Sequence, residues 1–130
     1  MKFVIGGAFQ GKCAEACRRY HMELEEIIDG ADCGFEEIFS CAGIRNFHEF
    51  IRRKLEAHES VDQLCSELLA KNPQIVIVST EIGYGIVPME PKQRDWREKT
   101  GRISCEIAKA SDEVIRVVAG IGTMIKGEVA

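Results

Sequence analysis

The chain has 130 residues, of which 45% are hydrophobic and 29% charged, and its formal net charge is −4 at pH 7. This composition is typical of one globular domain with a single core. The acidic balance and the lack of a basic run exclude a typical nucleic-acid-binding protein. No apolar run approaches the roughly 18 residues of a membrane span, and Phe3–Ile5 is too short for a signal peptide. We therefore expect a cytoplasmic protein.

The first third of the chain predicts a strand, a helix and a second, short strand. Residues 2–5, with the apolar run Phe3-Val4-Ile5, indicate a buried strand. Apolar residues then recur at helical spacing from Lys12 to Ile27, and Asp29-Gly30 predicts the end of that helix. Residues 37–39 predict a short strand.

The middle of the chain predicts two helices. The first, amphipathic helix carries Ile44, Phe47, Ile51 and Leu55 on one face. Ser60 is typical of an N-cap and predicts a helix through residues 61–69. Asn72-Pro73 ends it, because the residue before a proline disfavours helical geometry.

The remainder alternates strands with one long helix. Residues 75–78 are continuously apolar and β-branched, as in a central parallel strand. A helix is expected over about 92–110, followed by strands at 113–119 and 123–126. The alternation predicts one α/β domain over residues 1–130, with a mostly parallel sheet covered by helices on both faces.

Between the first strand and the first helix lies a glycine-rich loop of the form G-x-x-x-x-G-K, the pattern of a P-loop. Backbone N–H groups in such a loop surround an anion, and the following helix adds its positive N-terminal end. We expect nucleotide phosphates to bind at Gly6, Gly7, Ala8, Phe9, Gln10, Gly11, Lys12 and Cys13. The alternative is a glycine-rich connection in which Lys12 is merely solvated.

Two residues bear on catalysis at this loop. A Ser or Thr hydroxyl that binds Mg²⁺ normally follows the P-loop lysine, but Cys13 stands there, and a thiol is a poor ligand for a hard cation. Glu81 follows the central strand, where open parallel sheets bind their ligands. We expect Glu81 to hold Mg²⁺ through water or to orient a substrate hydroxyl; the alternative is a solvated strand end.

Arginines on the long helix are candidates for phosphate contact, since a guanidinium fork suits phosphate oxygens. They are Arg94, Arg97 and Arg102, although helices also carry solvated arginines. His48 and Trp96 lie on or beside apolar helix stripes, so packing roles are favoured over chemistry for both. The six cysteines show neither C-x-x-C nor zinc-finger spacing and are expected to be mostly buried free thiols.

Several segments together resemble the adenosylcobinamide kinase/adenosylcobinamide-phosphate guanylyltransferase family. The loop at residues 6–12 is similar to that family's opening, and E-I-G-Y-G-I-V-P at 81–88 is similar to its N-E-x-G-x-G-I-V-P segment. Arg94, Trp96-Arg97 and Gly101-Arg102 fall at the spacing of its arginine helix. Residues 110–126 resemble its C-terminal segment.

The resemblance implies a RecA-like P-loop fold and a role in cobalamin synthesis or salvage. The family phosphorylates the aminopropanol hydroxyl of adenosylcobinamide with GTP or ATP, and then transfers GMP onto that phosphate through a guanylylated histidine. Its members are typically oligomeric. The expected ligands are therefore a nucleoside triphosphate, Mg²⁺ and a corrinoid, in a homo-oligomer.

The sequence departs from the family in the segment that carries the guanylylated histidine. No paired histidine followed by Arg-Pro occurs, and Phe47-His48-Glu49 does not match. The chain is also shorter than typical members. The expectation is thus a shortened, kinase-like member without the guanylyltransferase half. A nucleotide- or corrinoid-binding protein without turnover is the alternative.

Overall fold

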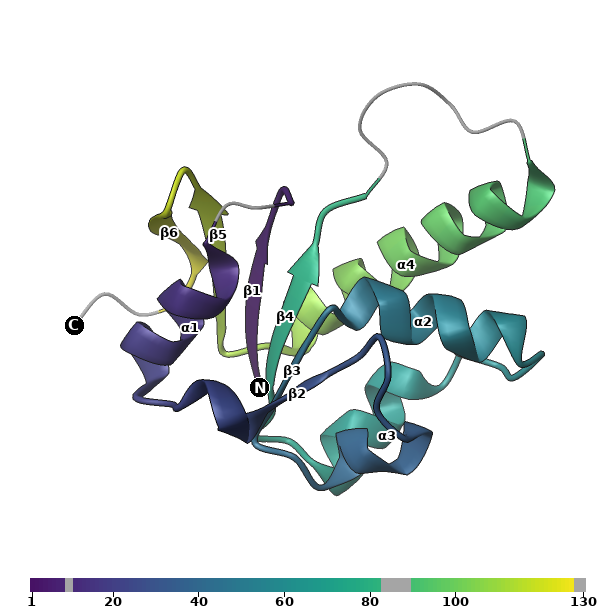
Figure 1. Ribbon diagram of the computed structural model, residues 1–130, viewed down its shortest axis with the longest axis horizontal. Helices are drawn as coiled ribbons and strands as arrows, with labels where there is room; N and C mark the ends of the chain where they lie inside the picture. The colour runs from purple at the N-terminus through teal and green to yellow at the C-terminus, as the bar shows by residue number, and fades with distance from the viewer. Residues whose placement is uncertain (9–10, 83–89, 128–130) are drawn as a thin grey trace.

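The computed structural model describes residues 1–8, 11–82 and 90–127 (Figure 1). Six strands form one sheet in the order β2-β3-β4-β1-β5-β6. Neighbouring strands are parallel except β5 and β6, which pair antiparallel. The strands are β1 (Lys2–Gly6), β2 (Ile27–Asp29), β3 (Gly43–Arg45), β4 (Val76–Thr80), β5 (Glu113–Val118) and β6 (Ile121–Lys126).

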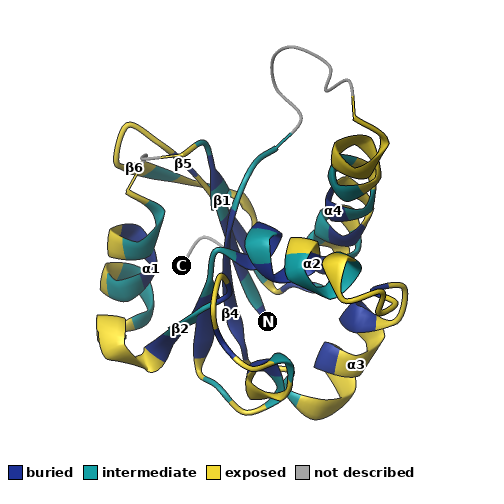
Figure 2. Cartoon of the chain, turned by 45° about the vertical axis from the view of Figure 1, so that its right-hand side comes forward, coloured by how far each residue is buried: buried dark blue, intermediate teal, exposed yellow. Residues whose placement is uncertain are grey.

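Helices cover both faces of the sheet (Figure 2). Helix α1 (Lys12–Tyr20) packs on one face, where Ala16 meets Val4 and Val78. Helices α2 (Phe47–Glu56), α3 (Leu64–Lys71) and α4 (Pro91–Ala110) share the larger core on the other face. Two 3₁₀ turns, η1 (Leu24–Glu26) and η2 (Phe35–Phe39), complete the described elements.

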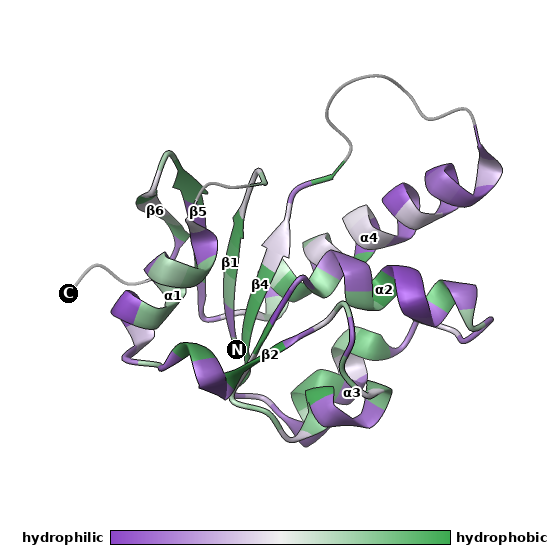
Figure 3. Ribbon diagram, viewed as in Figure 1, coloured by the Kyte–Doolittle hydropathy of each residue, from purple (hydrophilic) through white to green (hydrophobic). Residues whose placement is uncertain are grey.

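The predicted α/β architecture is confirmed, and so are the first strand, the central strand, the long helix and the two C-terminal strands. Strands β1 and β4 are mainly hydrophobic, with β4 paler toward its end, whereas the half of α4 that lies farther from the sheet is mainly hydrophilic (Figure 3). In the described part of the chain, no helix combines the length and apolarity needed to cross a membrane.

The prediction of one helix from Lys12 to Ile27 is wrong. Helix α1 ends at Tyr20, because His21 adopts left-handed geometry with φ 53°. The N–H groups of His21 and Met22 both donate to the Cys17 carbonyl and close the helix end. The following residues form η1 and then the edge strand β2.

Three further boundaries differ from those predicted. Residues 37–39 lie in a 3₁₀ turn rather than a strand, and Ile44 lies in β3 rather than in a helix. Helix α2 begins only after Asn46, whose φ of 53° separates it from β3.

Helix α3 begins at Leu64 and not at residue 61, because the Ser60 hydroxyl accepts from the Asp62 N–H at 3.2 Å in a local turn.

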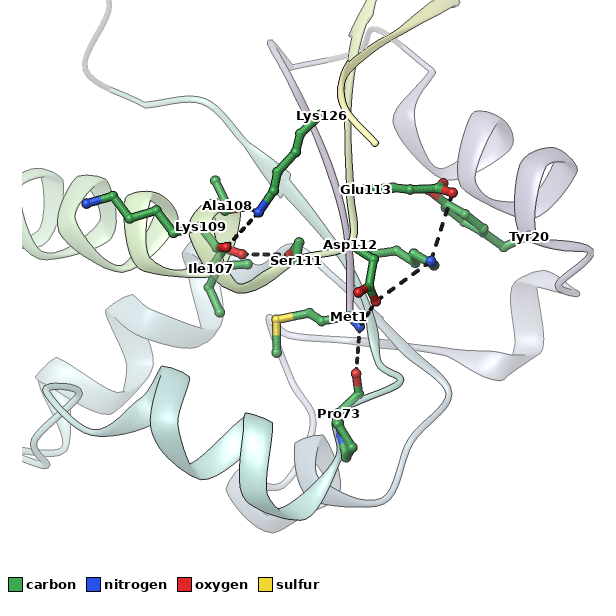
Figure 4. A network of polar contacts seen from close by, with 11 residues as sticks. Met1, Tyr20, Pro73, Ile107, Ala108, Lys109, Ser111, Asp112, Glu113 and Lys126 are labelled. Atoms are coloured by element: carbon green, nitrogen blue, oxygen red, sulfur yellow. Dashed lines mark hydrogen bonds and ion pairs between the residues drawn. The ribbon is translucent and has the colours of Figure 1, made fainter. Parts of the chain in front are cut away.

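Polar contacts tie the strands together at the edge where β1 and β5 begin (Figure 4). The Met1 amino group donates to the Pro73 carbonyl at 2.6 Å and pairs with the Asp112 carboxylate at 3.1 Å. From α1, the Tyr20 hydroxyl donates to Glu113 at 2.9 Å. These contacts therefore lie at the edge of the sheet opposite to the one where the parallel strands end.

Replacement of Gly6 by alanine should destabilise the fold. A Cβ atom at Gly6 would collide with the Val117 carbonyl oxygen of the neighbouring strand β5, and backbone cannot move aside cheaply. Gly101 in α4 is the matched control, since a Cβ there meets nothing within 4 Å. Gly101→Ala should instead raise stability by about 0.5–1 kcal/mol. Denaturant melts of both variants measure the difference, and equal melts would contradict the close approach.

Candidate nucleotide-binding site

The parallel pairing brings the glycine loop and the end of β4 to the same edge of the sheet. Gly6 lies opposite Thr80 on one side and Val117 on the other. The Glu81 N–H donates to the Gly6 carbonyl at 2.8 Å, so Glu81 is held directly beside the start of the loop. Ligands of open parallel sheets bind at this edge.

Six of the eight predicted loop residues lie in the described part of the chain; Phe9 and Gln10 lie outside it. Gly6, Gly7 and Ala8 lead out of β1, and Gly11 caps helix α1 with a φ of 83°, a left-handed geometry that suits glycine. Helix α1 therefore begins in this loop, and the first N–H groups of a helix lack partners within it. This arrangement fits the binding of an anion.

Lys12 stands at the first turn of α1 and folds back over the loop. Its ammonium group donates to the Gly7 carbonyl at 2.7 Å. Burial lowers the pKa of Lys12, while the negative charges of Cys13, when ionised, and of Glu81 act to raise it. Lys12 would exchange its bond to Gly7 for a phosphate oxygen when an anion enters.

A cavity of about 220 Å³ opens beside Lys12. The half-buried Cys13 lines it, and burial raises the pKa of its thiol, so the sulfur is protonated at neutral pH. The remaining lining comes from the ends of β3 and β4. The complete set is Gly11, Lys12, Cys13, Arg45, Asn46, Val78 and Thr80.

A second cavity, of about 250 Å³, lies between β4 and α4 and shares Thr80 with the first. Glu81 lines it. Ser79 and Thr100, each 2% exposed, also line it, and among the described residues neither hydroxyl has a hydrogen-bond partner. Buried hydroxyls without partners are costly, so these two groups mark unsatisfied polar atoms beside this cavity.

Glu81 does not stand alone at the strand end. Arg116 of β5 pairs with it through Nε at 3.1 Å and Nη2 at 3.2 Å. A carboxylate held in this way is a poor direct ligand for Mg²⁺, and Cys13 offers sulfur. Within the described ranges, no group of three or more His, Cys, Asp or Glu side chains is arranged to hold a metal. Cys13 and the paired Glu81 therefore do not fit Mg²⁺ as direct ligands, and the predicted role of Glu81 in holding it through water stays a prediction.

The three helix arginines fall in two places. Arg94 and Arg97 share a stripe of α4 with Gly101 and Ser104, which line the cavity beside Glu81. Arg102 lies off that stripe, and its guanidinium is 3.4 Å from Glu98 on the exposed side of the helix. The structure therefore brings Arg94 and Arg97 onto the cavity's side of α4 and places Arg102 elsewhere.

His48 and Trp96 have the packing roles expected of them. His48 is 9% exposed, and its Nδ1 accepts from the Thr80 N–H at 3.3 Å. The Trp96 indole N–H donates to the His48 carbonyl at 2.9 Å and ties α4 to α2. All six cysteines are free, but the prediction that most of them are buried is wrong. Cys33 and Cys65 are buried, Cys105 is exposed, and the other three are partly buried.

A cavity larger than these two lies away from the loop. Its volume is about 590 Å³, and it is lined by residues of α2 and α4 with the segments next to them, including Leu55 and Trp96. No residue of the glycine loop is among its lining residues. Size alone therefore does not mark the site on which the sequence motifs converge.

Sequence reasoning missed Arg45, Arg116, Ser79 and Thr100. Arg45 ends a strand that the sequence did not predict, so its position at the edge could not be inferred. Arg116 did carry a signal, because it is the one basic residue inside the otherwise apolar run 114–119. The two hydroxyls are ordinary in sequence, and only their burial distinguishes them.

Comparison with known proteins decides the family. The sequence model of the family described as cobinamide kinase / cobinamide phosphate guanyltransferase matches residues 35–125. The chain belongs to this family. The match takes in residues 35–73, which the resemblance noted above did not cover, and the glycine loop lies outside it.

Two curated relatives agree. The bifunctional adenosylcobalamin biosynthesis protein CobU of Salmonella typhimurium is 45% identical over 53 residues, which are 41% of this chain and 29% of the relative. The protein of that name from Escherichia coli is 40% identical over 68 residues, 52% of this chain and 36% of the relative. The matched part thus spans only about a third of each relative's length.

The pH dependence of stability should report on His48. Burial lowers the pKa of its imidazole, an effect that the charges of Lys12 and Arg52 strengthen and that of Glu49 opposes. The unfolded chain then binds more protons below about pH 6.5. The contribution of His48 is therefore present above that pH and is lost as the pH falls.

His48→Asn retains an acceptor for the Thr80 N–H but cannot titrate. We expect wild type to lose stability more steeply than this variant as the pH falls below about 6.5, by up to about 1.4 kcal/mol per pH unit. Denaturant melts at a series of pH values measure this. Parallel profiles for the two proteins would show that His48 titrates as it does in the unfolded chain.

Proposed function

We propose that the chain is a nucleoside-triphosphate-dependent kinase of cobalamin synthesis or salvage that phosphorylates the aminopropanol hydroxyl of adenosylcobinamide. The single observation that carries this is the pair of adjoining cavities that share Thr80. One is lined by Lys12 and the start of α1, and the other by Glu81 and two unpartnered hydroxyls. A phosphate donor and a hydroxyl acceptor thus have neighbouring places, and family membership supplies the substrate class.

In the proposed reaction the triphosphate tail of GTP or ATP lies against the loop at residues 6–13. The bond from the γ-phosphorus to the β-phosphate oxygen breaks, and a bond from the γ-phosphorus to the acceptor oxygen forms. Lys12 offsets the charge that spreads over the transferred group, and Arg94 and Arg97 approach it from α4.

Glu81 orients the acceptor hydroxyl in this proposal, and the hydroxyl proton leaves toward its carboxylate. Arg116 positions Glu81 through their ion pair. The guanylyltransferase half is not proposed, because the histidine motif is absent from the sequence and the Nδ1 atom of His48 already accepts from Thr80. The cytoplasmic location and the homo-oligomer predicted from the sequence remain predictions.

Binding without turnover is the second candidate function. Cys13 favours it, because the thiol replaces a hydroxyl that would help to position a metal-bound triphosphate. The ion pair between Glu81 and Arg116 also favours it, since it withdraws the carboxylate from the acceptor. This candidate retains the nucleotide or corrinoid ligand and omits the chemical step.

Turnover distinguishes the two candidates. Purified protein with GTP or ATP and cobinamide should form cobinamide phosphate, assayed with and without Mg²⁺. Lys12→Ala should lower triphosphate affinity by about ten- to a hundredfold, the loss expected for one charge-assisted hydrogen bond. Nucleotide-dependent thermal shift measures that affinity. Unchanged affinity in Lys12→Ala would refute the loop assignment, and tight binding without product would favour the second candidate.

Glu81→Gln tests the acceptor side separately. The amide keeps the size of the side chain but cannot take a proton, so kcat should fall about a hundredfold or more while triphosphate affinity changes little. Arg102→Gln is the matched control on the opposite side of α4 and should leave both values unchanged. Equal kcat in Glu81→Gln and wild type would remove Glu81 from the proposed chemistry.

A further inference from the structure

Among the described residues, the lining of the cavity beside Lys12 offers no negatively charged donor for a hard cation. Its lining contains no carboxylate, and the side chain that follows the P-loop lysine is the protonated thiol of Cys13. Two neutral oxygen donors line the cavity, the Thr80 hydroxyl and the side-chain amide oxygen of Asn46, whose Nδ2 donates to Asp29 at 2.8 Å. Magnesium binds through oxygen ligands in near-octahedral geometry. The described lining therefore lacks both a carboxylate and the hydroxyl that normally follows the P-loop lysine, the groups that would hold the metal of a metal-bound triphosphate.

A fixed positive charge stands in the same cavity. Arg45 ends β3 and lines the cavity together with Cys13. Burial raises the pKa of the Cys13 thiol, and among the influences that oppose this the positive charge of Arg45 is the strongest. The positive charge of the guanidinium therefore influences the side chain at position 13, where a P-loop normally has a metal-binding hydroxyl.

The guanidinium of Arg45 has donors to spare. Its Nη2 lies 3.4 Å from the Asp29 carboxylate, a long contact. That carboxylate already accepts shorter bonds, from the Asn46 side chain at 2.8 Å and from the Ala31 N–H at 2.9 Å. Within the described residues, Arg45 Nε is buried without an acceptor. Asp29 therefore fixes the guanidinium in place without saturating it.

We propose that Arg45 takes the role of the divalent cation, so that this chain binds the triphosphate tail of a nucleotide through Lys12, Arg45 and the N-terminus of α1 without a bound metal. This rests on the proposed nucleotide site. A planar guanidinium donates in pairs to phosphate oxygens and is always charged, so it supplies both the geometry and the charge that the metal would bring.

Affinities measured in EDTA and in excess Mg²⁺ test this directly. The probes are GTP, ATP and inorganic tripolyphosphate, the last of which reports on the phosphates alone. Wild type should bind all three with unchanged affinity when Mg²⁺ is removed. Arg45→Gln should lower each affinity by about ten- to a hundredfold, and Arg45→Lys should restore part of the loss because it keeps the charge but not the fork.

Two further variants sharpen the result. Arg52→Gln removes an exposed arginine of α2 that pairs with its helix neighbours Glu49 and Glu56 and lies over the Trp96 ring. Arg52 does not line the cavity beside Lys12, so this variant should bind as wild type does. The double variant Cys13→Ser with Arg45→Asp introduces a hydroxyl and a carboxylate into the cavity. It should bind triphosphate only when Mg²⁺ is present, since both groups are hard oxygen donors.

Loss of wild-type binding in EDTA would overturn the proposal, and so would wild-type affinity in Arg45→Gln. The EDTA comparison uses wild-type protein, so it decides the matter even if Arg45→Gln fails to fold. The outcomes also separate this proposal from the nucleotide site itself. If Lys12→Ala weakens binding and wild type requires Mg²⁺, only the role of Arg45 fails; if Lys12→Ala binds as wild type does, the site fails.

Discussion

The parallel pairing of β1 with β4 and β5 is the constraint on which the rest of the structure depends. It sets Gly6 opposite Thr80 and Val117, and the Val117 carbonyl leaves no room for a side chain at Gly6. Because these strands run the same way and β3 also pairs parallel with β4, the glycine loop, Glu81 and the end of β3 open at one edge of the sheet. Every proposed ligand contact follows from that register.

Charge at this edge is arranged in two parts. On the side of the glycine loop lie Lys12, Arg45 and the N-terminus of α1, all of which attract an anion. On the side of α4, Glu81 is balanced by Arg116, and unpartnered hydroxyls line the cavity. The first part suits a polyphosphate and the second a neutral polar acceptor. The same division explains why the metal expected from the sequence finds few donors here.

The sequence predicted the fold class and the elements with strong patterns. The predictions of a strand at residues 75–78 and of a helix at 92–110 are confirmed. A continuous run of β-branched residues and a sustained helical spacing are each compatible with few other structures. The wrong predictions concern helix ends, whose positions are set by the backbone geometry of single residues. His21 and Asn46 adopt positive φ and end or delay helices, and no periodicity reports that. As a result β2 and β3 were missed, and with them the position of Arg45.

Site residues that belong to a sequence motif could be predicted. Residues that are brought to the site only by packing could not. The loop pattern predicted Gly11 and Lys12, and the end of the apolar strand predicted Glu81. Arg116, Ser79 and Thr100 acquire meaning only from their partners or their burial.

The central claim is that residues 6–13 hold a triphosphate. The most direct measurement is a titration of the isotopically labelled protein with GTP, followed by the backbone amide signals in nuclear magnetic resonance spectra. We predict that the largest changes occur at Gly6, Gly7, Ala8, Gly11 and Lys12. Changes confined to the large cavity between α2 and α4, with the loop signals unmoved, would contradict the account.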